Sequence, residues 1–254
     1  MGGGGQEANV CLLVAPTAVE DCRITSVLEN EISELKIGRA SWIRKVADSI
    51  FPADLYRRLD DDRPGQARNH LYEMQSRRRE FLRRGGIKPT YFDRFISWPI
   101  PKGNCGTMYN QLERNVLVPL LRAKENRNCM ELAVNPFGEE GELRVHEPSR
   151  DNKPIGGPCL SHISFTLIKK AVTMTAIYRN HYYITRAYGN LVGLRDLQRF
   201  VCQETGYELG EMLCVSSHAD LYEDGFAKGR IRTMLRRCRE RITDVLPFEQ
   251  VIGG

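Results

Sequence analysis

Long apolar runs are missing from this sequence of 254 residues. No stretch approaches the roughly 18–20 apolar residues that a membrane-spanning helix needs. The chain opens with Met1 and the glycines at 2–5, and it lacks the charged and apolar regions of a signal peptide. We therefore expect a cytoplasmic protein with no membrane association. Residues 1–9 are predicted to form a flexible leader, and residues 10–254 a single domain.

Metal-binding and disulfide patterns are missing as well. None of the eight cysteines forms a CxxC pair, and no histidine follows at the spacing of a zinc finger. Without a secretion signal, a disulfide framework is a poor fit to a chain of this length. The sequence therefore predicts no metal site. Most of the cysteines are expected to be small core residues, and one of them is a candidate nucleophile.

A large excess of charge is also missing. Lys and Arg number 37 against 32 Asp and Glu, and the net charge of +5 is not by itself that of a nucleic-acid-binding protein. Two stretches, residues 66–84 and 230–241, are nevertheless rich in arginine. We interpret both as solvated helix faces, with phosphate or RNA contact as the alternative. Few aromatic residues are interleaved with them, which disfavours RNA binding.

Apolar patterning predicts a mixed α/β domain. Strands are expected at residues 10–15, 129–134, 160–168, 172–178 and 212–217, with a hairpin across Lys169 and Lys170. Helices are expected at residues 24–35, 42–59 after an N-cap at Ser41, 66–84, 112–123 and 188–204. Residues 138–157 are rich in glycine, proline and charge, and we expect an exposed insertion there.

One cysteine, Cys159, has a setting that suits catalysis. It follows Gly156-Gly157-Pro158 and begins a buried strand, so a sharp turn would present its sulfur at the edge of a sheet. The hairpin would return Arg179 towards it, and a neighbouring cation stabilises a thiolate. The alternatives are a buried structural thiol at Cys159 and an ordinary salt bridge at Arg179.

Three polar residues further along the chain suit ligand binding. Asn190 precedes a predicted helix and offers a donor and an acceptor to the edge of a pyrimidine-like ring. It could instead cap that helix. His218 and Asp220 end a predicted strand, where they could bind sugar hydroxyls. For His218 the alternative is a core histidine whose hydrogen bonds are satisfied internally.

Taken in order, these residues resemble the thymidylate synthase superfamily. Twenty residues separate Cys159 of Gly157-Pro158-Cys159 from Arg179 of Tyr178-Arg179-Asn180, and eleven more lead to Asn190; both intervals match the family. The interval to His218-Ala219-Asp220 is about two residues shorter. Upstream, the matching positions are Tyr91 seven residues before Trp98-Pro99, the segment Asn126-Arg127-Asn128, and Trp42 with Asp48.

The resemblance implies a thymidylate synthase-like layered α/β fold, with a large mixed β-sheet flanked by helices, in a homodimer. It implies that Cys159 adds to C6 of a pyrimidine nucleotide, and that 5,10-methylenetetrahydrofolate supplies a methyl or hydroxymethyl unit to C5. Tyr91 would organise water and Asp48 would transfer protons. The substrate would contact Arg127 from the partner subunit, Arg179, Asn180, Asn190, His218 and Asp220. Trp98 and Tyr182 would lie at the cofactor.

The sequence departs from the family mainly on the folate side. Leu160 replaces a histidine, Tyr182 replaces the aspartate that holds the pterin ring, and Arg186 and Ala187 stand near two absent glycines. We therefore expect a one-carbon transferase of specialised nucleoside metabolism, related to pyrimidine nucleotide hydroxymethylases as well. One alternative is a folate-independent relative that acts on a nucleotide or another heterocycle through Cys159. The other is a non-catalytic nucleotide-binding or RNA-binding homologue.

Overall fold

The structure is a computed structural model, and it describes residues 6–35, 42–59, 65–84, 89–99, 108–122, 130–134, 159–221 and 227–245. Several predicted features lie outside the described residues. They are residues 1–5 of the leader, the N-cap Ser41, the phosphate ligand Arg127 and the whole of the insertion at 138–157.

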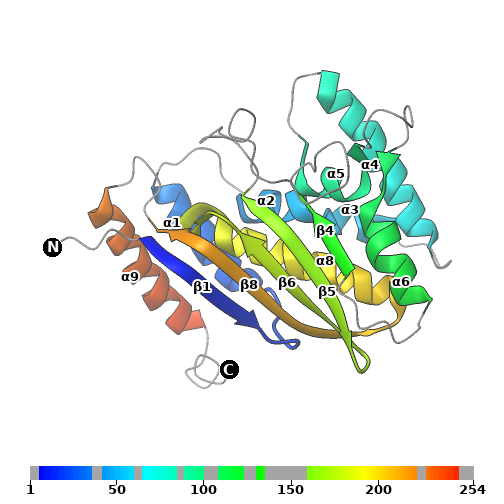
Figure 1. Ribbon diagram of the computed structural model, residues 1–254. Coiled ribbons are helices and arrows are strands. Elements are labelled where there is room, and N and C mark those ends of the chain that lie inside the picture. The colour runs from blue at the N-terminus through cyan, green and yellow to red at the C-terminus, as the bar shows by residue number, and fades with distance from the viewer. Residues whose placement is uncertain are drawn as a thin grey trace.

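A mixed six-stranded sheet lies at the centre of the described structure (Figure 1). Its strands are β1 (Gln6–Val14), β4 (Met130–Ala133), β5 (Leu160–Ile168), β6 (Ala171–Tyr178), β7 (His181–Tyr182) and β8 (Glu208–Asp220). They follow the order β1, β8, β6, β5, β4, with β7 also paired to β8. β6 and β7 run parallel to β8, and the other neighbours are antiparallel. The predicted α/β class with a large mixed sheet is confirmed.

The hairpin between β5 and β6 forms where the sequence predicts it. Ile168 pairs with Ala171 across Lys169 and Lys170. Lys169 has a φ of 57°, as the short turns of β-hairpins require. Every second residue of β6 is buried, because one face of the sheet packs onto the core.

Two strands, β1 and β8, are longer than their apolar residues predict, and β8 extends over Glu208–Asp220 instead of residues 212–217. β1 begins at Gln6, so residues 6–9 belong to the sheet and the leader predicted over residues 1–9 is too long. The reason is the antiparallel pairing of β1 with the far end of β8, where Gln6 faces Asp220. Pairing satisfies the backbone groups of polar residues too, and hydropathy does not report this.

Two predicted helices are divided at prolines. Residues 42–59 form α2 (Trp42–Ile50) and α3 (Ala53–Arg58), because Pro52 has no N–H to donate within a continuous helix. Residues 112–121 form a π-helical segment, η1 (Leu112–Leu117), and α6 (Val118–Leu121), which has a proline in its first turn. The other helices are α1 (Cys22–Glu34), α4 (Gln66–Arg84), α5 (Tyr91–Ile96), the π-helical η2 (Tyr183–Ala187), α8 (Tyr188–Thr205) and α9 (Lys228–Val245).

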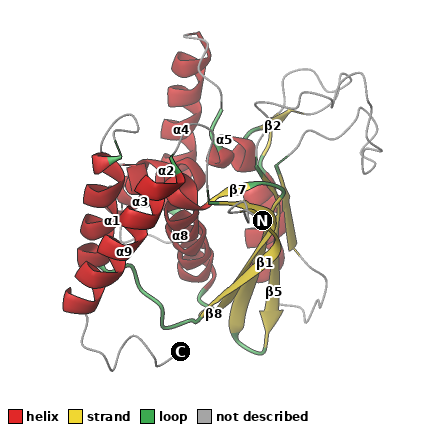
Figure 2. Cartoon of the chain, turned by 90° about the vertical axis from the view of Figure 1, so that its left-hand side faces the viewer, coloured by secondary structure: helices red, strands yellow, loops and turns green. Residues whose placement is uncertain are grey.

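Helices α1, α2, α3, α8 and α9 gather on one side of the sheet (Figure 2). α8 lies against β6 and β8. An aromatic cluster joins these layers: Phe51 lies 5.5 Å from Phe92 of α5 and 4.8 Å from Phe200 of α8, measured between ring centroids. None of the helices in the described part of the chain has the length and hydropathy to span a bilayer.

α2 and α8 approach each other at two glycines. A Cβ atom on Gly189 would lie 2.7 Å from the Cβ of Val46, and one on Gly193 would lie 2.5 Å from the backbone oxygen of Ala47. Only glycine leaves room for backbones this close. The contact fixes the first turn of α8, which carries Asn190, against α2.

Candidate active site

The start of β5 lies beside the ends of β6 and β8 at one edge of the sheet, because β5 is antiparallel to β6 and β6 is parallel to β8. Cys159 directly precedes β5 and Arg179 directly follows β6. The backbone N–H of Arg179 donates to the carbonyl oxygen of Cys159 at 3.0 Å. The hairpin therefore returns Arg179 to Cys159, as the spacing predicts.

Burial and charge act on Cys159 in opposite directions. The residue is half-buried, and burial raises the pKa of its thiol, whereas the guanidinium groups of Arg179 and Arg186 lower it. Burial outweighs the two cations, so Cys159 is a thiol at neutral pH and its attack on a ligand needs a proton acceptor. Arg186 entered the sequence analysis only as a departure from the family, and its charge on Cys159 was missed.

Tyr91 contacts the backbone at the nucleophile. Its hydroxyl oxygen accepts the N–H groups of Cys159 at 3.2 Å and of Leu160 at 3.4 Å. A capping box between Thr90 and Asp93 fixes the start of α5, where Tyr91 lies. Burial raises the pKa of Tyr91, which keeps the phenol neutral. Since the oxygen accepts two N–H groups, the phenol proton remains for a further acceptor.

Tyr178 is a second phenol beside Cys159, and no motif in the sequence indicates a role for it. It is fully buried at the end of β6, and its hydroxyl has no hydrogen-bond partner within the described blocks of the chain. Burial raises its pKa well above the usual value, with smaller contributions from Tyr91, Cys214 and Cys159. Its ring stacks on His181, with centroids 4.1 Å apart and an interplanar angle of 6°.

Asn190 lies inside α8 and does not cap it, so the prediction that it precedes the helix is wrong. Ala187 is the N-cap of α8. β7 and η2 lead directly into this helix, which moves its start ahead of the glycine at position 189. The side chain of Asn190 is buried, and its amide nitrogen lies 3.0 Å from Nε2 of His181.

The end of β8 supplies further polar groups. Nδ1 of His218 lies 2.9 Å from Oδ1 of Asn180, and both residues are half-buried. Asp220 is almost fully buried and pairs with Tyr182 of β7. Asn180, Tyr182, His218 and Asp220 therefore form one polar group beside Arg179, whose side chain is exposed.

For three predicted site residues, Asp48, Trp98 and Arg127, the described part of the chain shows no contact with this polar group. Asp48 has a pKa raised by burial, and its charged neighbours are Arg44, Asp54, Asp196 and Arg78. No contact in the described residues connects it to Cys159. Trp98 lies in the short strand β2 (Trp98–Pro99), paired with β3 (Met108–Tyr109), and its side chain is outside the described part. Arg127 is outside it as well.

The residues present do not fit folate in the way the family holds it. The pterin ring of folate is held by a carboxylate in that family, and Tyr182 offers a single hydroxyl instead. A phenol cannot accept two hydrogen bonds side by side as a carboxylate does. Among the described residues, no cluster of histidine, cysteine and carboxylate side chains could hold a metal ion.

Several arginines of the two arginine-rich helices form ion pairs within the fold. In α4, Arg68 lies 2.7 Å from Glu204 and 3.2 Å from Glu113. In α9, Arg237 and Arg241 both pair with Glu31 of α1, at 2.8 Å and 3.0 Å. These carboxylates neutralise part of the arginine charge that a phosphate-binding surface would use.

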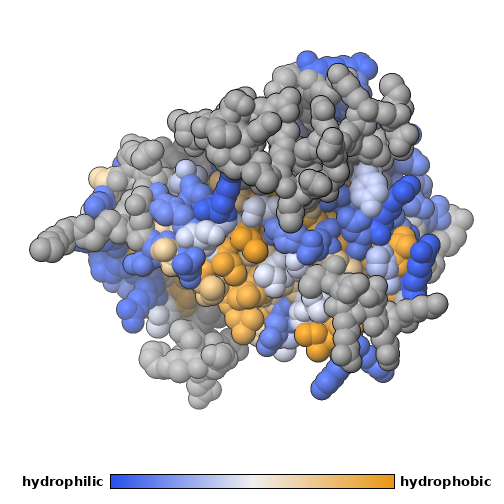
Figure 3. All heavy atoms as spheres, in the orientation of Figure 1, coloured by the Kyte–Doolittle hydropathy of each residue, from blue (hydrophilic) through white to orange (hydrophobic). Residues whose placement is uncertain are grey.

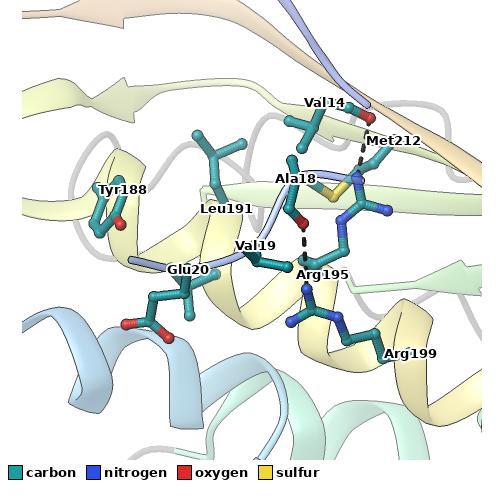
Figure 4. A pocket seen from close by; sticks show the side chains of 10 residues that line it. Val14, Ala18, Val19, Glu20, Tyr188, Leu191, Arg195, Arg199 and Met212 are labelled. Carbon is teal, nitrogen blue, oxygen red and sulfur yellow. Dashed lines mark hydrogen bonds between the residues drawn. The ribbon is translucent and has the colours of Figure 1, made fainter. Parts of the chain in front are cut away.

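A separate pocket of about 170 Å³ lies between α8 and the chain that follows β1 (Figure 4). Arg195 crosses it to donate to the carbonyl oxygens of Val14 at 3.0 Å and Ala15 at 2.6 Å, and Arg199 donates to Ala18 at 3.2 Å. None of the predicted site residues lines this pocket. Its arginines serve to attach the end of β1 to α8.

Comparison with known proteins adds a distant relationship. No known protein-family profile matches the chain. It is 28% identical over 142 residues to a protein of Methanothermobacter marburgensis named "Putative thymidylate synthase", a match that spans 55% of this chain and 60% of that protein. A thermostable thymidylate synthase A from Bacillus subtilis aligns structurally over 92% of this chain and 70% of its own, with a TM-score of 0.49 and 14% identity. The resemblance to the thymidylate synthase family is thereby confirmed as a distant sequence similarity.

Proposed function

We propose that this protein is a thymidylate synthase-like transferase. It binds a pyrimidine nucleotide, forms an adduct between Cys159 and C6 of the base, and transfers a methyl or hydroxymethyl unit to C5. The observation that supports this most is the meeting of Arg179, Tyr91 and Cys159 at one edge of the sheet. Two nearby cations oppose the effect of burial on the pKa of the Cys159 thiol, and a cation beside a cysteine favours the thiolate that acts as a nucleophile.

The Cys159 thiol gives its proton to an acceptor, its sulfur bonds to C6, and the electron pair of the C5=C6 bond moves to the oxygen on C4. C5 is then nucleophilic and attacks the one-carbon electrophile. Loss of the C5 proton, with the donor's leaving group departing, leaves a methylene carbon on C5. Water or hydride then adds to this carbon as the sulfur departs, which gives a hydroxymethyl or a methyl group; in the parent reaction of the family, tetrahydrofolate would supply the hydride. Tyr91 holds the backbone of Cys159 in place and keeps one proton to order water at the ring.

Charged and polar neighbours would bind the nucleotide around this centre. Arg179 is exposed at the site and would pair with the phosphate while also acting on Cys159. Asn190 would contact the edge of the base, and His218 with Asp220 and Asn180 would contact the sugar. Arg127 would add a phosphate contact from the partner subunit.

A folate-independent reaction is the second candidate, and Tyr182 is the observation that favours it. The hydroxyl in place of the pterin carboxylate leaves the nucleotide half of the site better supplied than the folate half. The same addition of Cys159 would then serve another electrophile, or a proton.

Intact-mass spectrometry tests the proposal. The protein is incubated with 5-fluoro-dUMP or 5-fluoro-CMP, with and without methylenetetrahydrofolate, beside Cys159→Ala. We expect the wild type to gain the mass of one fluoronucleotide, plus the mass of methylenetetrahydrofolate where folate is the donor because C5 cannot lose fluorine, and the variant to gain neither. If the adduct requires folate, folate is the donor; if it forms without folate, the second candidate holds. Bound nucleotide with no adduct in any arm would contradict both and leave the non-catalytic binding homologue.

Oligonucleotide binding, measured at several salt concentrations, tests whether the protein is a non-catalytic RNA-binding homologue. A surface of phosphate-neutralising arginines gives an affinity that falls steeply with salt concentration. We expect no such binding, because Arg68 of α4 and Arg237 and Arg241 of α9 already pair with carboxylates. Tight and steeply salt-dependent binding would favour an RNA-binding protein.

A further inference from the structure

A buried arginine crosses the pocket between α8 and the chain that follows β1 (Figure 4). Arg195 is 5% exposed, and its guanidinium donates four hydrogen bonds to neutral oxygens. The acceptors are the side-chain oxygen of Gln198 and the carbonyl oxygens of Gly210, Val14 and Ala15, at 2.8, 3.0, 3.0 and 2.6 Å. Within the described residues, no carboxylate is among the groups that act on this cation. Arg195 is therefore a buried charge that the described part of the fold does not neutralise.

One donor of Arg195 also lacks an acceptor. A guanidinium has five N–H groups, and the N–H on Nε of Arg195 is buried with no hydrogen-bond partner in the part of the chain that the structure describes. Burial lowers the pKa of this guanidinium, and the charge of Arg199 adds to the effect. Burying a cation is costly unless an opposite charge pairs with it. An anion beside Arg195 would supply both the opposite charge and an acceptor for Nε.

The walls of the pocket around Arg195 are mostly apolar. They are formed by Val14, Ala18, Val19, Leu191, Val192 and Met212. Glu20 lines the pocket as well, but its carboxylate already pairs with Arg44 and accepts the hydroxyl of Thr25 at 3.1 Å. The volume is about 170 Å³, and an apolar cavity of about 150 Å³ is large enough to hold benzene. The space therefore suits a ring or a chain of about six carbon atoms.

We propose that this pocket is a second ligand site, which binds a small organic carboxylate with its charged end at Arg195 and its apolar body against Leu191 and Met212. An apolar pocket with a few convergent polar groups is the usual form of a small-molecule site. A guanidinium and a carboxylate form strong, charge-assisted hydrogen bonds. None of the residues predicted to bind the nucleotide lines the pocket, so this inference does not depend on the proposed function.

NMR of the methionine methyl groups tests the inference on the full chain. The protein is labelled with carbon-13 at these methyls and titrated with benzoate, with hexanoate and with benzamide, which has the shape of benzoate without its charge. Met212 is fully buried in the pocket wall, so a ligand on the protein surface does not reach it. Met234 of α9 reports on the remainder of the fold. Met212→Leu assigns the signal.

We expect benzoate and hexanoate to shift the Met212 signal in a saturable way and to leave the Met234 signal in place. Benzamide should bind at least about tenfold more weakly, because it brings no charge to the buried cation. Excess dUMP should leave benzoate bound. The inference is overturned if neither carboxylate moves Met212, if benzamide binds as well as benzoate, or if dUMP displaces benzoate, which would place the carboxylate at Arg179.

Two variants remove the site in different ways. Arg195→Met removes the cation, and Ala18→Phe fills the pocket while keeping the cation and its four hydrogen bonds. Each should weaken benzoate binding at least about tenfold. Arg122→Met is the matched control, because it removes the same charge at an exposed position after α6, and it should bind benzoate like the wild type. Unchanged affinity in Ala18→Phe or in folded Arg195→Met would overturn the inference and leave the proposed function intact.

Discussion

At the scale of single residues, the chemistry of this site depends on the balance that sets the state of Cys159. Burial raises the pKa of the thiol and two guanidinium groups lower it. A phosphate bound at Arg179 would share that cation with the thiolate, so nucleotide binding and nucleophile activation are linked through one side chain. This linkage predicts how the pKa of Cys159 in the free protein changes when Arg179 is replaced.

Replacing Arg179 with glutamine should raise the pKa of Cys159 further, because the thiolate loses a stabilising cation. The sign follows from the charge: a lost positive neighbour favours the neutral thiol. Alkylation of Cys159 by iodoacetamide, followed on its peptide by mass spectrometry, should become several-fold slower at pH 8. Its pH profile should move to higher pH, and Arg186→Gln should act in the same direction.

Arg199→Gln is the control for this measurement, because Arg199 is not among the charges that act on Cys159. Identical alkylation profiles for wild type and Arg179→Gln would show that the cation does not reach the sulfur. The account of the nucleophile would then lose its electrostatic basis.

At the scale of elements, the crossing of α2 and α8 positions Asn190. Gly193→Ala would place a Cβ atom 2.5 Å from the backbone oxygen of Ala47, which cannot move aside like a flexible side chain. We expect a loss of about 1–3 kcal/mol in the free energy of unfolding, the usual effect of overpacking. Urea denaturation measures it.

Gly229→Ala is the matched substitution, because a Cβ atom on Gly229 of α9 meets nothing within 4 Å. Alanine should there stabilise the protein by up to about 1 kcal/mol through its better helix propensity. Equal effects of the two substitutions would mean that the close crossing of α2 and α8 is not present in solution.

Elements with strong apolar periodicity could be predicted from the sequence, and those defined by pairing could not. The boundaries of α4 and of β5 agree with the predictions because each carries a continuous pattern ended by breakers. β7 has two residues and is defined by its pairing with β8, so no local sequence pattern predicts it. Pro52 is a local signal for the division of residues 42–59 into two helices, although the apolar pattern continues across it.

The site shows the same division. Cys159 and Arg179 could be placed together from the hairpin alone, since antiparallel strands return the chain to its start. Tyr178, His181 and Ser216 could not, because their contacts join β6, β7 and β8 across the sheet. The sequence offers one weak cue, because His181 directly precedes Tyr182 and Tyr183 and a histidine ring beside aromatic residues can pack against them.

At the scale of the whole molecule, one face of the sheet presents apolar side chains to solvent (Figure 3). Leu13 is 65% exposed and pairs with Leu213, while Cys11 beside it pairs with Val215. Apolar patches on a sheet face mark interaction surfaces. A second copy of this chain is the partner that the proposed function requires, because Arg127 is to be donated across an interface.

Light scattering should therefore give the mass of a dimer, about twice 29.0 kDa. Leu213→Lys should shift the protein to monomer, because it buries a charge in the proposed interface. Phe81→Lys should not, since Phe81 is 76% exposed on α4, away from the sheet. A wild-type monomer with full nucleotide affinity would remove the role of Arg127.

The identity of the reacting cysteine tests the central claim most directly. Cys11 and Cys22 are exposed, whereas Cys159 is half-buried, so non-specific modification would favour the first two. After incubation with 5-fluoro-dUMP, the digested protein is mapped for the peptide that carries the nucleotide mass. We predict that the mass is on Cys159. Attachment at Cys11 or Cys22, or an adduct that persists in Cys159→Ala, would contradict the assignment of Cys159 as the nucleophile.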